Sequence, residues 1–311
     1  MRGAIARLCL TALFVAPASA FPAATPASTS NAPVPGVLTV HKRVEEVQIV
    51  FTVQDGNKPV TNLTGDQLML WEDGQPIPTI TTFREQSDLP LRLGVLVDRS
   101  GSMQKGFAAE QHAARQFLER LLRPKIDSVF LANFSTHVSI SQVPAVSSHL
   151  ILADLESMQA SGLTALYDAL VEASRNSMMS ARGSQPVRRV IILLSDGEDN
   201  YSRYSLEDAI AAAQESEIVI YAVTAHKGSP RAGDAVLRRL AEATGGRAFV
   251  LKSFNRLDTV FTQMEDELRT QYSVTFHPLS AQQCGYHSIE LRPINRRLRI
   301  NARNGYYSCR P

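Results

Sequence analysis

Cysteine is scarce in this sequence of 311 residues: there are three, and one of them, Cys9, lies among the first twenty residues. No Cys-x-x-Cys or His-Glu-x-x-His spacing accompanies them, so a zinc site of either common type is not expected. An excess of one charge is also lacking, because 32 Lys and Arg oppose 30 Asp and Glu, and Arg2 and Arg7 make up the surplus. A mature chain without basic excess lacks the electrostatic signature of nucleic-acid binding, so no nucleic acid is expected as a partner.

Long apolar runs are missing as well, since none approaches the roughly 20 residues that span a bilayer. The run from Leu8 to Val15 follows two arginines and precedes Ala18-Ser19-Ala20, a small-residue pattern that signal peptidase requires. We therefore predict a signal peptide over residues 1–20, with a short membrane anchor as the alternative. The mature chain is then exported to the periplasm, the cell surface or the medium, and has no transmembrane segment after cleavage.

The remaining cysteines, Cys284 and Cys309, belong to a chain whose predicted export permits disulfides. A bridge between them would contribute roughly 3 kcal/mol to stability if it acts mainly on the entropy of the unfolded chain. We predict a Cys284–Cys309 disulfide, with two free thiols as the alternative.

Period-two alternation of apolar residues occurs in two parts of the chain, on either side of a long central stretch. Residues 21–36, before the first part, are rich in Pro, Ala, Ser and Thr and are predicted to be a flexible linker. Short strands are predicted in residues 37–88 and 271–311, at Val37–Val40, Val47–Val53, Gln67–Trp71, Ile77–Phe83, Tyr272–Phe276, His287–Leu291 and Leu298–Ile300. The two segments form one β-sandwich in the preferred interpretation and two unconnected β appendages in the alternative.

Residues 89–270 show a different pattern, in which continuous apolar runs alternate with stretches of helical periodicity. The runs are Leu93–Val97, Val129–Ala132, Val190–Leu194, Ile218–Val223 and Ala248–Leu251. Such runs are typical of strands that are buried on both faces of a parallel sheet. Between them, Ser205 and Asp208 have the spacing of a helix start, and apolar residues from Leu257 to Leu268 form a helical stripe. The pattern predicts an α/β domain with a doubly wound sheet.

Three oxygen-bearing side chains, Asp98, Ser100 and Ser102, follow the first of these strands at alternate positions. Oxygen ligands of this kind suit Mg²⁺, Mn²⁺ or Ca²⁺. One carboxylate and two hydroxyls do not complete a cation site, but Thr164 lies on a turn before a helix and Asp196 follows another apolar strand. If the strands before Asp98 and Asp196 are neighbours at the point where strand order reverses, their loops converge on one place.

These residues resemble the metal-ion-dependent adhesion site of the von Willebrand factor type A family, which is Asp-x-Ser-x-Ser with a distant Thr and a distant Asp. Asp98, Ser100 and Ser102 match the first element, Thr164 the second and Asp196 the third. The resemblance implies that these five residues hold a divalent cation, Mg²⁺ or else Mn²⁺ or Ca²⁺. It also implies a Rossmann-like domain with a six-stranded, mostly parallel sheet, flanked here by a small all-β domain.

The resemblance further implies a binding function, because an Asp or Glu of a partner protein completes the coordination of the ion in this family. We therefore predict a metal-dependent protein-binding or adhesion module outside the cytoplasm. A narrower resemblance, to an exported bacterial subfamily common in Acidobacteria, extends to Glu72-Asp73-Gly74 and to residues 304–307. The helix at residues 254–268 resembles the one that shifts in family members when such a ligand binds.

Enzyme motifs are absent from the sequence, which has no Gly-x-Ser-x-Gly elbow and no Gly-rich phosphate loop, so the chain is not predicted to be an enzyme. A metal-dependent hydrolase of the cell envelope is the alternative, because His226 follows a neighbouring strand and could approach the site as a base. A third interpretation keeps the fold and gives the metal a purely structural role. Asp168 is expected to orient loops and not to contact the ion.

Overall fold

The structure, a computed structural model, describes residues 46–56, 58–86, 88–140, 148–178, 187–226, 229–279 and 284–308. All of them belong to the unit formed by residues 44–311. The predicted signal peptide, the predicted linker, the predicted strand at residues 37–40 and Cys309 lie outside the described residues.

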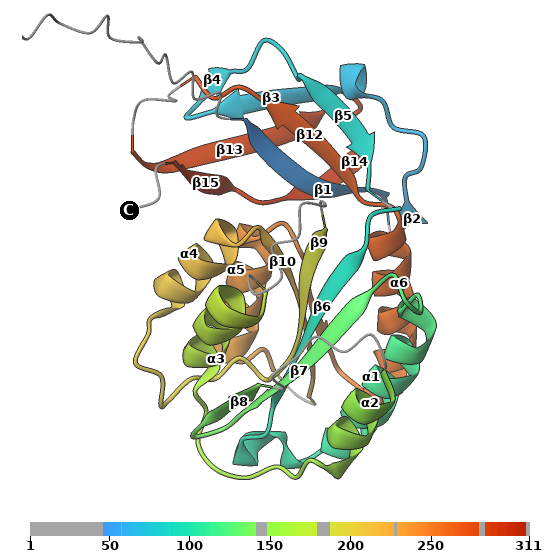
Figure 1. Cartoon of the computed structure of the whole chain (residues 1–311), viewed down its shortest axis with the longest axis vertical. Coiled ribbons are helices and arrows are strands. Elements are labelled where there is room, and N and C mark those ends of the chain that lie inside the picture. Colours follow the sequence, from blue (N-terminus) through green and yellow to red (C-terminus); the bar gives the residue numbers. More distant parts are fainter. Residues whose placement is uncertain are drawn as a thin grey trace, which may run out of the picture. The chain divides into compact units, whose positions relative to one another are not determined.

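Strands from both ends of the described chain build an all-β part with two antiparallel sheets (Figure 1). The strands are β1 (Val47–Asp55), β2 (Lys58–Pro59), β3 (Leu68–Glu72), β4 (Gln75–Pro76), β5 (Thr82–Glu85), β12 (Tyr272–Phe276), β13 (Gly285–Pro293), β14 (Leu298–Ala302) and β15 (Gly305–Ser308). One sheet has the order β14-β1-β12-β5 with β2 beside β1, and the other has the order β15-β13-β3-β4. Because β1 lies between two C-terminal strands and β3 pairs with β13, the prediction of an all-β part built from both segments is confirmed.

An apolar core lies between the two sheets and is formed by side chains of both segments. Phe51 of β1, for example, stacks on Tyr272 of β12 with a distance of 5.8 Å between ring centroids. The strand predicted over Ile77–Phe83 is wrong for residues 77–81, because β5 begins only at Thr82. Pro78 in this stretch has no N–H group to donate to a neighbouring strand, which explains the break.

The α/β part has a six-stranded sheet with the order β11-β10-β9-β6-β7-β8. Its strands are β6 (Leu91–Asp98), β7 (Ser128–Phe134), β8 (Val138–Ile140), β9 (Arg188–Leu194), β10 (Ile218–Ala225) and β11 (Ala248–Leu251). Its helices are α1 (Phe107–Leu121), α2 (Ser148–Ser157), α3 (Leu166–Glu172), α4 (Leu206–Glu215), α5 (Ala232–Ala243) and α6 (Leu257–Arg269). Shorter helical turns are η1 (Gly65–Gln67), η2 (Gly101–Gln104), η3 (Ala173–Ser177) and η4 (Phe254–Arg256). All neighbouring strands are parallel except β7 and β8, so the predicted fold class is confirmed.

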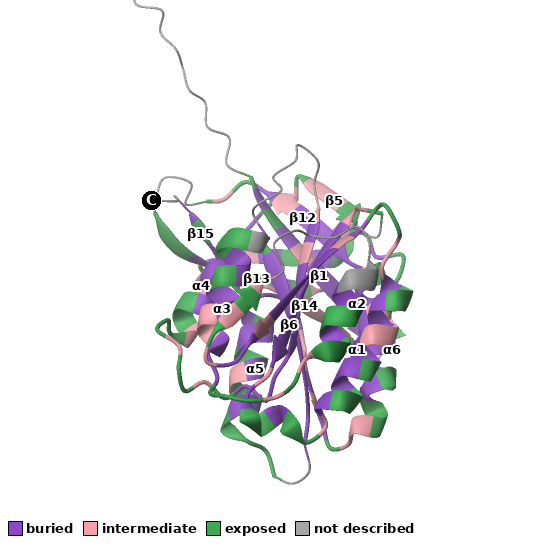
Figure 2. Ribbon diagram, turned by 60° about the horizontal axis from the view of Figure 1, so that its bottom comes forward, coloured by how far each residue is buried: buried purple, intermediate pink, exposed green. Residues whose placement is uncertain are grey.

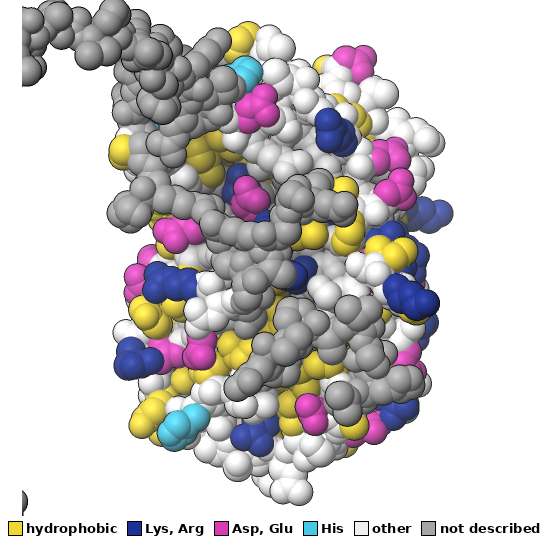
Figure 3. All heavy atoms as spheres, viewed as in Figure 1, with side chains coloured by type: hydrophobic (Ala, Val, Ile, Leu, Met, Phe, Trp, Pro, Cys, Tyr) yellow, Lys and Arg dark blue, Asp and Glu magenta, His cyan; other side chains and the backbone are white. Residues whose placement is uncertain are grey.

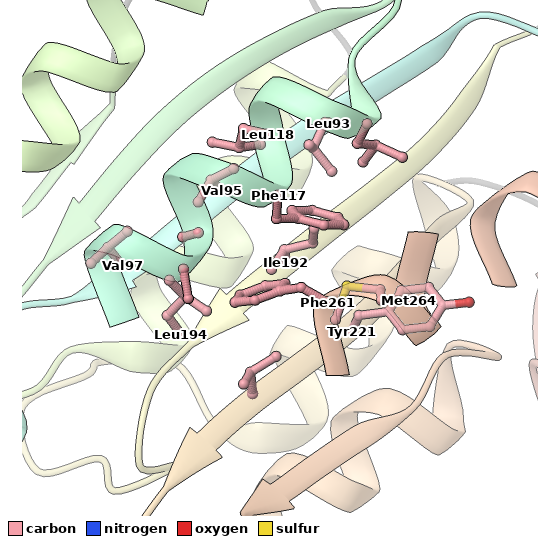
Figure 4. Close-up of a cluster of buried hydrophobic side chains, with 14 of the residues drawn as sticks. Leu93, Val95, Val97, Phe117, Leu118, Ile192, Leu194, Tyr221, Phe261 and Met264 are labelled. Atoms are coloured by element: carbon pink, nitrogen blue, oxygen red, sulfur yellow. The ribbon is translucent and has the colours of Figure 1, made fainter. Parts of the chain in front are cut away.

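Helices cover both faces of this sheet, and successive residues of its strands point to opposite faces. Leu93 and Val95 of β6 belong to a core with α1, α2 and α6, whereas Leu96 belongs to a core with α3, α4 and α5. Figure 4 shows the first core, in which Phe117 of α1 and Phe261 of α6 stack with a centroid distance of 4.9 Å. Burial on both faces explains the continuous apolar runs, and Figure 2 shows the buried strands between helices with exposed outer faces.

The strand order reverses between β6 and β9. The chain adds β7 and β8 on one side of β6 and then returns to add β9, β10 and β11 on the other side. The carboxyl ends of β6 and β9 therefore lie side by side, with Val97 opposite Leu194. Doubly wound sheets bind ligands at such a reversal, and the loops after these two strands carry Asp98 and Asp196.

The α/β part is inserted between β5 and β12 of the all-β part, and these two strands are neighbours. Glu85 pairs with Tyr272, and the backbone N–H of Gln86 donates to the carbonyl of Gln271 at 2.7 Å. The chain thus enters and leaves the α/β part at adjacent points. From there β6 runs away from the all-β part, so its carboxyl end lies at the end of the α/β sheet that is remote from the all-β part (Figure 1).

Candidate metal centre

The loop after β6 presents the first three predicted ligands. Asp98 is completely buried, and its Oδ1 accepts a hydrogen bond from the backbone N–H of Ser100 at 2.9 Å, which holds the turn in place. The hydroxyl oxygens of Ser100 and Ser102 lie 3.0 Å apart. Ser100 is buried and Ser102 is exposed, so the side-chain oxygens of this loop extend from the interior to the surface.

Thr164 lies in a second loop, which precedes α3 and is tied to the loops on either side. The backbone N–H of Gly101 in the first loop donates to the carbonyl of Gly162 at 3.1 Å. The backbone N–H of Thr164 donates to the side-chain oxygen of Asn200 at 2.9 Å, and the carbonyl of Thr164 accepts from the N–H of Asn200 at 3.0 Å. The buried Thr164 is therefore fixed between the loops that follow β6 and β9.

Asp196 lies in the third loop, directly after β9. The hydroxyl of Ser195 donates to Oδ2 of Asp98 at 2.6 Å and so connects the first and third loops. Oδ1 of Asp196 accepts a hydrogen bond from a backbone N–H of its own loop at 3.2 Å. Its Oδ2 is buried and has no hydrogen-bond partner among the described residues. Gly197 has φ +77°, and a Cβ atom there would lie 2.3 Å from the carbonyl oxygen of Gly233, so this turn requires glycine.

The carboxylates of this site are buried without a cation in hydrogen-bond contact. Burial raises the pKa of Asp98 to about 6, the negative charge of Asp196 adds to the rise, and hydrogen bonds from Ser100 and Ser195 oppose it. Burying a charge without a partner costs free energy, and a divalent cation among these oxygens would remove that cost. The unpartnered Oδ2 of Asp196 and the all-oxygen donor set therefore fit a hard divalent cation.

Glu110 is a residue of this region that the sequence analysis missed. It lies on α1 and is almost completely buried. Its pKa is raised to about 8, first by burial and then by the negative charges of Asp98 and Asp196. The sequence does contain a signal, because Glu110 shares a helix face with Phe107 and Ala114, which are buried. A charged residue on the apolar face of an amphipathic helix is rare and indicates a special environment.

A cavity of about 520 Å³ opens beside the loops that follow β6 and β9, and its lining includes Ser102, Lys105, Glu110, Asp196, Arg231 and Phe254. His226, which the sequence places after a neighbouring strand, lines the same cavity. The Nε2 atom of His226 lies 2.9 Å from Oδ1 of the buried Asp234. Its Nδ1 atom is buried and has no hydrogen-bond partner among the described residues.

The amino end of α1 touches the short helix that leads into α6. Gly106 has φ +104°, and a Cβ atom there would lie 2.0 Å from the ring of Phe254, so only glycine fits. Phe254 is the first residue of η4, which continues directly into α6. The segment that carries Ser102 is thus in contact with the C-terminal helix, and a shift of that helix on ligand binding stays a prediction.

Asp168 orients a neighbouring loop, as the sequence suggested. Its Oδ1 accepts hydrogen bonds from the backbone N–H groups of Arg203 at 2.8 Å and Tyr204 at 3.1 Å. Asp199 acts in the reverse direction, because its Oδ2 accepts from the backbone N–H of Tyr167 at 3.2 Å. These bonds hold the loop after β9 against α3, the helix that follows Thr164.

A second group of side chains that could surround an ion lies in the all-β part. Glu72, Asp73 and His287 offer ligand atoms within 4.8 Å of one another. Their atoms already have partners, however. The hydroxyl of Tyr306 donates to Oε1 of Glu72 at 2.5 Å, and Nδ1 of His287 lies 2.8 Å from Oδ2 of Asp73. We interpret this group as a polar network that connects β3, β13 and β15, unlike the site at Asp196 with its unpartnered oxygen.

On the face shown in Figure 3, the acidic and basic side chains of the described residues are interspersed and do not gather in one patch. Among the described residues, no helix has both the length and the apolar character needed to cross a bilayer.

A family model described as von Willebrand factor type A domain matches residues 93–263. In solved structures, the chain is similar to proximal thread matrix protein 1 from the mussel byssus with a zinc-occupied MIDAS motif, at 16% identity and a TM-score of 0.50, over 63% of this chain and 49% of that one. A von Willebrand factor type A structure from Catenulispora acidiphila has 11% identity and a TM-score of 0.49, over 86% of this chain and 72% of that one. The chain spans about half the length of the mussel proteins, and the likeness concerns the fold alone. No curated protein matches the chain.

Proposed function

We propose that this chain, which belongs to the von Willebrand factor type A domain family, is a metal-dependent protein-binding module. A partner protein supplies an Asp or Glu carboxylate to a divalent cation held by Asp98, Ser100, Ser102, Thr164 and Asp196. The observation that carries the proposal is the buried Oδ2 of Asp196, which has no hydrogen-bond partner among the described residues although its loop is fixed on both sides.

The donor set supports capture of a carboxylate. Two carboxylates neutralise a divalent cation, and the hydroxyls of Ser100, Ser102 and Thr164 add oxygen ligands without charge. An ion held in this way keeps an affinity for a further anionic oxygen, which a partner can supply. The mussel protein, whose structure has zinc in its MIDAS motif, supports the presence of an ion in this fold. The all-oxygen set of this chain favours Mg²⁺, or else Mn²⁺ or Ca²⁺.

Exposed apolar side chains beside the site support a protein as the partner. Leu163 is 47% exposed and Tyr201 is 51% exposed. Both lie next to Thr164, since Leu163 precedes it and the backbone N–H of Tyr201 donates to its carbonyl at 2.9 Å. Apolar and aromatic groups that surround a polar centre are typical of protein-binding surfaces.

The alternative function, a metal-dependent hydrolase, has one observation in its favour, because His226 lines the same cavity as Ser102. However, Nε2 of His226 is engaged with Asp234, and Nδ1 is buried without a partner among the described residues. Neither nitrogen is hydrogen-bonded to a serine hydroxyl of the site, so we propose binding without catalysis. Metal-dependent turnover of a generic ester or phosphate ester that is lost in His226→Ala would favour the hydrolase instead.

Export of the chain, and its assignment to the exported bacterial subfamily, are also proposals. They rest on the predicted signal peptide and on the resemblance at residues 72–74 and 304–307.

The predicted Cys284–Cys309 bridge has support from the strand register, because Gly285 pairs with Ser308 and these are the chain neighbours of the two cysteines. We expect alkylation of the denatured mature protein to label neither cysteine before reduction and both after it. Labelling of both cysteines before reduction would contradict the bridge.

A calorimetric titration of the mature protein with Mg²⁺, Mn²⁺ and Ca²⁺ tests the metal centre. Saturable binding is expected in the wild type and should disappear in the Asp98→Ala/Asp196→Ala double variant. Asp154→Ala removes an exposed aspartate of α2 and should bind the ion like the wild type. Capture of an extracytoplasmic partner should then be abolished by EDTA and by Asp98→Ala. Partner capture that ignores EDTA, together with no ion binding up to millimolar concentration, would refute the proposal.

A further inference from the structure

The cavity beside the metal centre extends from two predicted ligands to two cationic side chains. Ser102 and Asp196 line it together with Lys105 and Arg231. The side chain of Arg231 is 42% exposed, and Lys105 is also exposed, so both can be reached from solvent. With a volume of about 520 Å³, the cavity has room for side chains of a bound partner.

Neither cation is hydrogen-bonded to a carboxylate of the described residues. The Nη1 atom of Arg231 lies 4.0 Å from Oδ2 of Asp196, which is beyond hydrogen-bond distance. No carboxylate of the described residues forms an ion pair with Lys105. By contrast, the exposed Arg239 of α5 pairs with Glu207 at 2.8 Å. The cations at the cavity are therefore available to an anion from outside.

The other acidic groups near the cavity do not supply this anion. Glu110 is buried on α1. Asp234 is occupied on both oxygens, because Oδ1 faces Nε2 of His226 and Oδ2 accepts the backbone N–H of Arg231 at 3.0 Å. Among the described residues, the acidic side chains that line the cavity are Glu110 and Asp196, and the one ion pair of the Arg231 side chain is the 4.0 Å contact with Asp196. A closer acidic partner for Arg231 can therefore be supplied by a ligand.

An ion in the candidate metal centre would make Arg231 and Lys105 more attractive to an anion from outside. A divalent ion would take up the charges of Asp98 and Asp196, and Arg231 would lose the attraction of Asp196. Two exposed positive charges would then line the cavity that also contains Ser102 and Asp196, near the proposed position of the partner's first carboxylate. Side chains two residues apart on one face of an extended segment are separated by about 7 Å, which suits a second carboxylate so close to the first.

We infer that the partner segment carries two carboxylates, one that binds the ion and a second that enters the cavity and pairs with Arg231 and Lys105. The inference rests on the proposed function and defines its partner as an extended acidic segment of the type Asp-x-Asp or Asp-x-Glu. Arg231 and Lys105 are then residues that determine specificity, outside the five residues that hold the ion.

The test compares three fluorescently labelled, amidated peptides with the Mn²⁺-loaded protein by fluorescence polarisation. The first, Gly-Gly-Asp-Gly-Asn-Gly-Gly, has one carboxylate. The second, Gly-Gly-Asp-Gly-Asp-Gly-Gly, has two at the proposed spacing, and the third, Gly-Gly-Asp-Gly-Gly-Gly-Gly-Asp, has two that lie farther apart. The second peptide should bind about fivefold more tightly than the first, as one additional exposed ion pair allows, and the third should bind like the first.

Matched variants separate the cavity from the ion. In Lys105→Gln/Arg231→Gln the second peptide should bind no better than the first, while calorimetry shows Mn²⁺ binding at least as tight as in the wild type. Arg239→Gln removes a paired arginine and should keep the preference. Equal binding of the first two peptides to the wild type, or a preference that survives in the double variant, would overturn the inference alone. Absence of Mn²⁺ binding by the wild type, or binding of no peptide to the Mn²⁺-loaded wild type, would overturn the proposed function as well.

Discussion

Strand β6 meets a buried aspartate at each of its ends, and the two carboxylates have opposite surroundings. At the amino end, Asp127 accepts hydrogen bonds from the backbone N–H of Leu91 at 2.8 Å and from the guanidinium of Arg123 at 2.9 and 3.0 Å. At the carboxyl end, Asp98 accepts from a backbone N–H and from a serine hydroxyl, both of which are uncharged. The first aspartate has a cation of the protein as its partner, and the second does not.

The pKa values of the two aspartates follow from this difference. Burial opposes the charged form of Asp127, but the hydrogen bonds from Arg123 and from backbone N–H groups outweigh it and lower the pKa. At Asp98 burial prevails, and the pKa is raised to about 6. The comparison teaches that a guanidinium of the protein stabilises the charged form of Asp127, whereas no cationic side chain does so at Asp98. In the proposed function, the divalent cation takes that role at Asp98.

The largest change in stability is expected for substitution of Asp127, at the amino end of β6. Asp127→Ala leaves the N–H of Leu91 and the guanidinium of Arg123 without their acceptor, so we expect a loss of about 3 to 4 kcal/mol in the free energy of unfolding. Urea denaturation near neutral pH measures this loss. The exposed Asp154→Ala should stay within about 0.5 kcal/mol of the wild type. A loss of less than about 1 kcal/mol in Asp127→Ala would remove the contrast between the two ends.

At the carboxyl end of β6, substitution of the aspartate is expected to raise the unfolding free energy of the metal-free protein. Asp98→Asn keeps the size of the side chain and an oxygen that can accept the Ser100 N–H, while it removes a charge that burial disfavours. In EDTA we expect a gain of about 1 to 2 kcal/mol in unfolding free energy, again by urea denaturation. The same variant should bind Mn²⁺ at least about a hundredfold more weakly. A metal-free variant that is less stable than the wild type would show that Asp98 serves mainly to hold its own loop.

The smallest effect concerns the pH dependence contributed by Glu110. Its pKa is about 8 in the folded protein against 4.5 for the free side chain, so the folded state binds more protons between these values. The stability from the protonated group is complete below about pH 4.5 and is lost as the pH rises through about 8. In EDTA, the wild type should lose about 1 kcal/mol more than Glu110→Gln between about pH 7 and 9. If the urea midpoints of the two proteins changed equally between about pH 7 and 9, Glu110 would not contribute this pH dependence.

The positions of most strands and helices could be predicted from the sequence, but the pairing of the terminal strands could not. The continuous apolar runs of β6, β9 and β10 indicated a parallel sheet covered on both faces, and the stripe from Leu257 to Leu268 indicated α6. Alternation in the terminal segments showed that each strand has a buried face, but not which strand lies beside it. That β1 lies between β12 and β14 depends on contacts more than two hundred residues apart, for which the sequence has no local signal.

The candidate site could be predicted where its residues follow strands directly. Asp98 and Asp196 stand at or just after the ends of β6 and β9, so the strand order alone brings their loops together. Glu110 and Arg231 come from helix α1 and from the residue before α5, and their place depends on how these helices are rotated and packed. Such packing is a property of the whole fold. The sequence therefore indicated the predicted ligands Asp98 and Asp196 but not the neighbouring Glu110 and Arg231.

The insertion of the α/β part between β5 and β12 has a consequence for mechanical load. The chain enters and leaves this part at adjacent strands, and the candidate metal centre lies beyond the other end of β6. If a partner binds the proposed ion, a force on that partner would act along β6. Both edges of β6 are hydrogen-bonded over most of its length, to β7 and to β9. Such a force would load those hydrogen bonds together in shear and would not open them one after another, so we expect the α/β part to resist extension along β6.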